Sequence, residues 1–165
     1  MNLLYYPDPF LEKVVEEVDP TNPGFDPKEL KDEMVEFMIS NRGIGLAANQ
    51  IGLDKKVFVF GDSPDNANIF INPTILQYTE DVTLDDEGCL SFPDVYVKVK
   101  RPKEILATYL DENLEEQITK INGYSAKVYL HEMDHLLGIT IKDRVSKLKW
   151  DRATKRVAKA KKLYT

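Results

Sequence analysis

Residues 123–137, GYSAKVYLHEMDHLL, carry the strongest structural pattern in this chain. When this stretch is drawn as an α-helix, apolar side chains occupy most of its sides, which predicts a helix buried in the core. Gly138 follows at once, and a glycine in this position commonly ends a helix. The remaining segments are therefore expected to pack around this helix.

Two histidines of this helix, His131 and His135, are four residues apart and share one face, where both can bind the same metal ion. Glu132 is displaced by about 100° around the helix axis, so it lies beside such a metal, where a general base belongs. The alternative is a surface helix with two histidines by chance. Tyr129 and Met133 crowd the same turns, however, so the imidazoles and the carboxylate would be buried without a purpose. The pattern favours the metal.

The third metal ligand follows by elimination. The chain has no other histidine, and Ile141 stands where an extended metalloprotease pattern would place one. No glutamate follows Glu132, and the two downstream acids, Asp143 and Asp151, have basic neighbours that could pair with them. Cys89 is the only thiol; a lone cysteine is often a small buried apolar residue, but here two histidines await a partner. We expect a Cys-His-His site with a fourth position open to water, as in catalytic metal sites.

Such a site predicts hydrolysis of a carbonyl compound. A bound metal lowers the pKa of its water to about 7, and Glu132 would take the proton. A further segment, GIGLAANQ at residues 43–50, could assist, because the side-chain amide of Gln50 is an uncharged donor for a carbonyl oxygen. The alternative is a tight turn packed on the core. A phosphate-binding loop is disfavoured, since no Gly-Lys-Ser/Thr is present.

The rest of the chain predicts an α+β fold of antiparallel strands around the buried helix, with a C-terminal helix. Helical periodicity and Pro27 predict a first helix over 27–40. A third helix is expected over 146–163, with an apolar stripe of Trp150, Ala153, Val157 and Ala160. Strand-like segments lie at 57–60, 69–72, 75–78, 96–100, 105–110 and 117–121.

Length and composition agree with one soluble domain over 1–165. Apolar residues make up 42% and charged residues 30%, which disfavours collagen, disorder and a coiled coil. No apolar run approaches the ~20 residues of a membrane span, and the first ten residues resemble neither a secretory signal nor a transit peptide. The lone cysteine allows no intrachain disulfide, so a reducing cytoplasm is expected and no membrane partner.

Charge is unevenly distributed along the chain. Residues 1–141 contain 12 Lys/Arg and 26 Asp/Glu, a net charge of −14, whereas residues 142–165 contain 10 and 2, a net charge of +8. Together they give the −6 of the whole chain. A polyanion would therefore meet the C-terminal segment and not the acidic body.

Three segments together resemble the peptide deformylase family: GIGLAANQ at 43–50, EGCLS at 87–91 and HEMDH at 131–135. The family carries these motifs in this order, and the resemblance extends over roughly residues 3–146. It implies a hydrolase that removes the N-formyl group from the initiator methionine of nascent polypeptides and releases formate. Fe²⁺ is the expected metal, with Zn²⁺, Ni²⁺ or Co²⁺ able to replace it.

The resemblance also implies roles for individual residues. Cys89, His131 and His135 would bind the metal, and Glu132 would be the general base and acid. Gln50 and the backbone N–H of Leu90 would stabilise the oxyanion. Residues expected to contact the substrate are Gly45, along its backbone, and Ile44, Glu87, Tyr124 and Val128, around the methionine side chain. Asp134 is expected to pair with a basic residue, with Arg101 as a candidate, and Leu130 departs from the glutamine common at its position.

Two features of the sequence each allow more than one interpretation. The basic C-terminal helix could contact the ribosome, as in bacterial deformylases, or simply be a solvated face; ribosome binding would be salt-sensitive and lost on deletion of 152–165. The rival functions are a metallopeptidase or other amidase built on the same motif, and an inactive relative or basic-tailed RNA-binding module. The cysteine and the complete Glu132 and metal set argue against these rivals.

Overall fold

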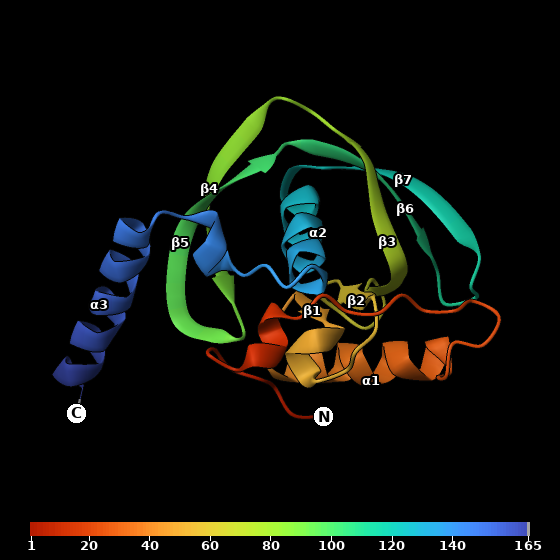
Figure 1. Ribbon diagram of the computed structural model, residues 1–165, viewed down its shortest axis with the longest axis horizontal. Helices are drawn as coiled ribbons and strands as arrows, with labels where there is room; N and C mark the ends of the chain where they lie inside the picture. Colours follow the sequence, from red (N-terminus) through yellow and green to blue (C-terminus); the bar gives the residue numbers. More distant parts are fainter. Residues whose placement is uncertain (165) are drawn as a thin grey trace.

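The structure is a computed structural model that describes residues 1–164, with two antiparallel sheets wrapped around one helix (Figure 1). The larger sheet has the strand order β1-β2-β3-β6-β7, and the smaller is the hairpin β4-β5. The strands of the two sheets are β1 Gly45–Ala47, β2 Val57–Phe60, β3 Asn68–Tyr78, β4 Val82–Cys89, β5 Phe92–Pro102, β6 Glu104–Leu110 and β7 Glu116–Asn122. The helices are α1 Pro27–Ser40, α2 Gly123–Leu136 and α3 Lys147–Leu163, with short 3₁₀ turns at Pro9–Glu12, Ala48–Ile51 and Ile141–Arg144.

Alternation along β2 explains how the larger sheet is covered on both faces. Val57 and Val59 belong to a cluster with α1, whereas Phe58 points to the other face and packs with α2. The ring of Phe58 meets Tyr129 of α2 edge to face, with centroids 4.9 Å apart. All three β2 residues are fully buried. The sheet is therefore held between α1 and α2.

Helix α2 lies between this sheet and the β4-β5 hairpin, as Figure 1 shows. It begins at Gly123, whose φ is +60°, and Gly138 beyond its end has a φ of +70°. At Gly138 the chain passes so close to the backbone of Glu12 that a Cβ atom would lie 2.4 Å from the Glu12 carbonyl oxygen. The predicted α+β fold with a central buried helix is confirmed.

The first predicted helix is confirmed, and the third begins at Lys147 with Ser146 as its N-cap. The strand predictions need correction in four places. Strand β1 was not predicted, and β5 extends over Phe92–Pro102 where the prediction was 96–100. Segments 69–72 and 75–78 form one strand, β3, whose pairing with β6 is irregular around Pro73. Strand β4 was not predicted, because its acidic run at 85–87 lacks the residues typical of strands.

The apolar stripe of α3 is only partly buried. Trp150 and Ala153 are buried against β5, where Trp150 meets Phe92 edge to face with ring centroids 5.3 Å apart. Val157 is half-buried and Ala160 is exposed. Only the first half of α3 is thus packed on the body, and the second half extends beyond it (Figure 1). In the part of the chain that the structure describes, no helix has the length and apolar character needed to cross a membrane.

Candidate active site

Three side chains that could hold one metal ion converge from two elements. His131 and His135 come from successive turns of α2, and Cys89 comes from the end of β4. Their ligand atoms all lie within 4.8 Å of one another: Sγ of Cys89 is 3.3 Å from Nε2 of His135, which is 3.1 Å from Nε2 of His131. The structure therefore brings together the cysteine and the two histidines singled out in the sequence.

The state of His131 shows that these atoms fit a cation. Burial opposes ionisation of Glu87, but hydrogen bonds from Arg101 and His131 outweigh it and hold the Glu87 pKa at about 2. An ionised carboxylate can only accept, so Nδ1 of His131, 2.9 Å from Oε1 of Glu87, carries the hydrogen. Hydrogen bonds to Cys89 and Glu87 outweigh burial and raise the pKa of His131 well above its ordinary value, so the ring is protonated on both nitrogens without a metal. A bound cation would take the place of the proton on Nε2, which lies beside Nε2 of His135 and Sγ of Cys89. A metal cation between them could be bound by all three ligand atoms.

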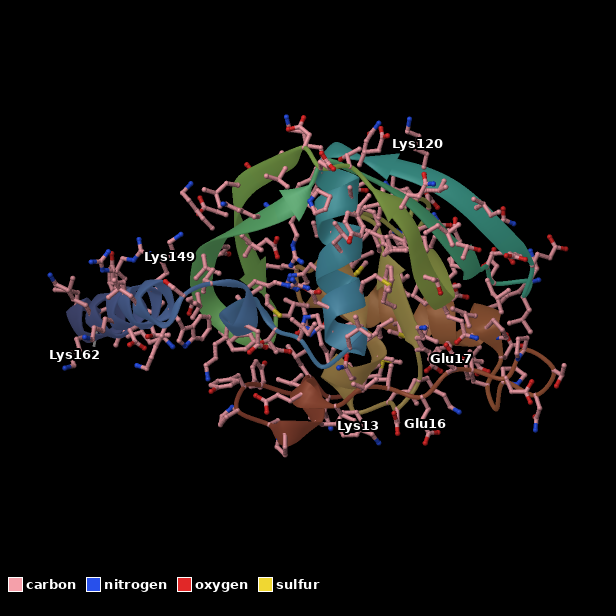
Figure 2. The ribbon with its side chains drawn as sticks, turned by 45° about the horizontal axis from the view of Figure 1, so that its top comes forward. Lys13, Glu16, Glu17, Lys120, Lys149 and Lys162 are labelled. Carbon is pink, nitrogen blue, oxygen red and sulfur yellow. The ribbon has the colours of Figure 1, made fainter. Side chains whose placement is uncertain are left out.

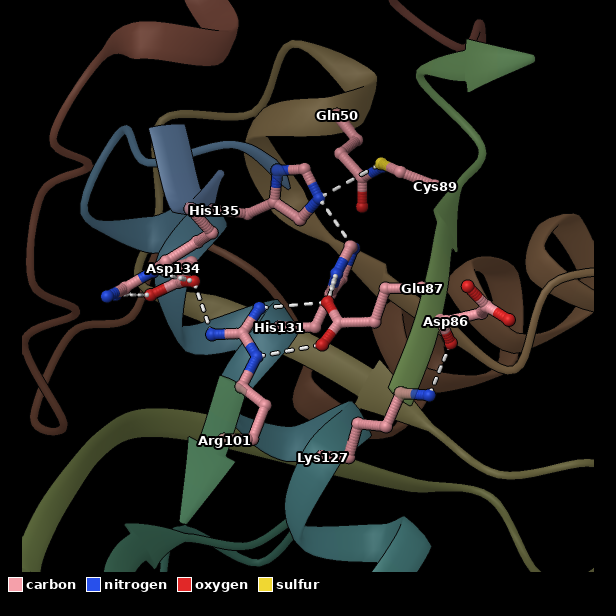
Figure 3. A network of polar contacts seen from close by, with 10 residues as sticks. Gln50, Asp86, Glu87, Cys89, Arg101, Lys127, His131, Asp134 and His135 are labelled. Atoms are coloured by element: carbon pink, nitrogen blue, oxygen red, sulfur yellow. Dashed lines mark hydrogen bonds and ion pairs between the residues drawn. The ribbon is translucent and has the colours of Figure 1, made fainter. Parts of the chain in front are cut away.

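Glu87 is itself held by a buried ionic network that joins β4, β5 and α2 (Figure 3). Arg101 donates to both oxygens of Glu87 at 2.8 and 2.9 Å, and its Nη1 donates to Asp134 at 2.6 Å. The expected pairing of Asp134 with Arg101 is confirmed. Arg144, which sequence reasoning missed, donates to both oxygens of Asp134 from the 3₁₀ turn after α2. The network fixes the ring of His131.

Glu132 lies beside the three ligands with one free oxygen. Its side chain is buried, and its Oε2 has no hydrogen-bond partner among the described residues. Burial raises the pKa of Glu132 to about 7, with the negative charges of Glu87 and Asp134 adding to the effect. The carboxylate is close to residue 45, where a Cβ atom would lie 2.3 Å from its Oε1. Only glycine leaves this space open.

The side-chain amide of Gln50 is oriented by its neighbours. Its Oε1 accepts a hydrogen bond from the backbone N–H of Ala47 at 3.0 Å. The amino group therefore faces the ligands, 3.6 Å from Sγ of Cys89 and 3.1 Å from the hydroxyl of Ser91. An uncharged donor is thus held next to the cysteine sulfur (Figure 3).

One cavity of about 700 Å³ connects these groups. Cys89 and His131 line this cavity. All the predicted catalytic and substrate-contacting residues line it as well: Ile44, Gly45, Gln50, Glu87, Leu90, Tyr124, Val128 and Glu132. His135 lies behind this surface and is almost fully buried.

Sequence reasoning missed several lining residues: Tyr5, Arg42, Phe92, Tyr96 and Lys127. Lys127 could have been found, because it precedes His131 by four residues and so shares its face of α2. The others carry no local signal, since their segments reach the cavity only through the tertiary fold.

A buried helix that presents two histidines and a glutamate, with a cysteine from a neighbouring strand, defines a metal-dependent hydrolase. The family model described as polypeptide deformylase matches residues 1–151. This chain belongs to the polypeptide deformylase family.

Individual relatives agree over nearly the whole chain. A peptide deformylase of Rhizobium meliloti is 38% identical over 164 residues, covering 97% of this chain and 93% of the relative. The crystal structure of a peptide deformylase from Synechococcus elongatus in complex with actinonin superposes with a TM-score of 0.86 at 34% identity, covering 94% and 85% of the two chains. One from Legionella pneumophila gives 0.87 at 30% identity, covering 99% and 96%.

Proposed function

We propose that this chain, as one catalytic domain, hydrolyses the N-formyl amide of the initiator methionine of nascent polypeptides in the cytoplasm and releases formate. The observation that carries the proposal is the free Oε2 of Glu132, a residue that lines one cavity with Cys89 and His131, while His135 completes the ligand group behind them. A proton acceptor at this point is what amide hydrolysis by water requires. Family membership supports the formyl group as the target.

Each residue has a task in this reaction. A divalent cation held by Cys89, His131 and His135 would supply Lewis-acid activation of the water and of the formyl carbonyl. Glu132 accepts the proton of the attacking water at Oε2 and returns it to the nitrogen of the leaving methionine. The Gln50 amino group and the backbone N–H of Leu90 donate to the oxygen that becomes negative in the tetrahedral state.

The cavity also provides for the methionine. The absence of a side chain at Gly45 lets an extended substrate backbone pass close to Glu132. Ile44, Tyr124 and Val128 supply apolar surface for the thioether side chain, and Glu87 closes the cavity near His131. We infer that Fe²⁺ is the physiological metal, and that Zn²⁺, Ni²⁺ or Co²⁺ can take its place, because one thiolate and two imidazoles suit all four.

The test is formate release from formyl-Met-Ala-Ser by protein loaded with Fe²⁺ under anaerobic conditions. We expect formate without cleavage of the Met-Ala bond, which separates a deformylase from a peptidase. The E132Q variant should keep its metal and lose at least about 10²-fold in kcat. Metal-loaded protein that releases no formate would refute the proposal, and an active E132Q would refute the role of Glu132. Loading with each of the four metals in turn then ranks them.

We further propose that the outward face of α3 contacts ribosomal RNA. Lys155, Lys159 and Lys162 are exposed on it, and Figure 2 shows how far this helix extends from the acidic body. Changing these three lysines to glutamate should abolish salt-sensitive ribosome binding, because phosphate contacts dominate such affinity. The same change at the exposed Lys28, Lys100 and Lys120 alters net charge equally and should leave binding intact. Equal loss in both variants would refute a specific role for α3.

A further inference from the structure

A second cavity, of about 920 Å³, lies between α3 and the β4-β5 hairpin. Its helical wall is formed by the inner face of α3, and its other wall by the hairpin. Its apolar lining comes from Tyr96, Ala153, Val157, Ala160 and Tyr164, and four charged residues, Asp86, Asp94, Arg156 and Lys161, complete it. All the residues of α3 that line this cavity lie beyond residue 151, where the match to the family model ends. We call this cavity the α3 groove.

The α3 groove continues the active-site cavity. Asp86, Asp94 and Tyr96 line both hollows. The ring of Tyr96 lies over the backbone of Gly88, where a Cβ atom would be 2.6 Å from a ring carbon. Gly88 directly precedes the metal-ligand candidate Cys89. A chain that leaves the active site across Tyr96 therefore enters the α3 groove without leaving the protein surface.

The helical wall of the groove is anchored to the active site. Trp150 and Ala153 are buried, and Trp150 packs edge to face on Phe92, which lines the active-site cavity. In contrast, Tyr96 is 63% and Tyr164 is 91% exposed, so apolar surface remains available beyond the anchor. An uncovered apolar surface next to an active site is suited to binding part of the substrate.

We propose that the α3 groove binds the segment of the nascent polypeptide that follows the residues held in the active-site cavity. The occupant is an extended peptide whose apolar side chains pack on Tyr96, Val157 and Ala160. This inference rests on the proposed function, since the same polypeptide must occupy both cavities. Its consequence is a preference for longer substrates with apolar residues downstream of the formyl-methionine.

The experiment compares three peptides by formate release. The first is formyl-Met-Ala-Ser, and the second extends it by about six residues, two of them leucine, which add about 20 Å when extended. The third has serine in place of both leucines. We expect the leucine peptide to have a kcat/KM about tenfold above the tripeptide, the gain from burying roughly two further methylene groups, mainly through KM. The serine peptide should gain little.

Two variants of α3 test where the gain arises. A160W fills the groove, because Ala160 is exposed and lines it. A158W is the matched control, because Ala158 is equally exposed on the same helix and is not among the groove's lining residues. We expect A160W to hydrolyse the tripeptide normally and to lose the gain for the leucine peptide. A158W should behave as the unaltered protein.

Each outcome decides the matter. Normal tripeptide hydrolysis with no gain from the leucines, or a gain that persists in A160W, would overturn the α3 groove as a substrate site. Self-association that A160W abolishes would also overturn it and assign the surface to a second copy of this chain. Failure to release formate from the tripeptide itself would instead refute the proposed function, so the two failures are distinguishable.

Discussion

The missing side chain of Gly45 and the carboxylate of Glu132 occupy adjoining space: a Cβ atom on residue 45 would lie 2.3 Å from Oε1 and 2.9 Å from the carboxyl carbon. The two residues come from β1 and α2, separated by most of the chain. Glu132 can therefore lie beside the metal-ligand candidates partly because residue 45 of β1 has no Cβ atom. This dependence can be tested by adding that atom.

The G45A variant should lose activity with little loss of stability. The added methyl group displaces only the end of a flexible side chain, so the fold can adjust while the carboxylate moves out of place. A misplacement on the order of 1 Å can cost about 10²-fold in rate. We expect kcat for formate release to fall by about that factor, with metal content and melting temperature unchanged. Wild-type kcat in a folded, metal-loaded G45A would contradict this account.

The amide of Gln50 can be tested by an isosteric change. In Q50E the carboxylate can still accept the hydrogen bond from Ala47, but the donor near Cys89 is replaced by a negative charge. We expect kcat to fall by about 10²–10³-fold, as for other lost oxyanion donors. Q77E, at an exposed position of β3, is the control and should remain active. Equal activity of both variants would show that Gln50 is structural only.

Arg101 should be essential to stability because two carboxylates depend on it. R101M would leave Glu87 and Asp134 buried with fewer partners, a change that costs about 3–5 kcal/mol of unfolding free energy. K103M removes the partner of Asp81 in an exposed pair and should cost less than about 1 kcal/mol. Urea unfolding of both variants at equal metal content measures the difference. Similar midpoints for the two would show that the buried network contributes little.

Metal binding should stabilise the fold. Nε2 of His131 and Nε2 of His135 lie 3.1 Å apart, so one cation could be bound by both once His131 has lost its Nε2 proton. With metal at about 100 times its Kd, we expect the melting temperature to lie about 5–10 °C above that of chelator-treated protein. C89S should show a smaller increase, because one ligand is weakened. A melting temperature that is indifferent to Fe²⁺, Zn²⁺ and chelator would exclude a metal at these residues.

The parts of the fold that the sequence predicted are those set by local pattern. The periodicity of α1 and α2 and the apolar run of β2 each reflect one element packing on its neighbours. Strand β4 was not predicted, because Asp85 and Asp86 point into solvent from the hairpin and do not pack on the core. Their side chains therefore give no apolar strand pattern. The pattern around Pro73 predicts two strands where β3 is one, since proline cannot donate to the ladder and the pairing with β6 is irregular there.

His131 and His135 share a face with Glu132 beside them because helix geometry fixes neighbours three and four residues apart, and the sequence predicts this without any tertiary contact. It also left Cys89 as the preferred third ligand by elimination. The contact between Gly45 and Glu132, the ion pairs of Arg101 and Arg144 with Asp134, and the groove beside α3 arise from the tertiary fold. Those contacts join segments far apart in the chain. They depend on how the hairpin and the sheet close around α2, which no local spacing encodes.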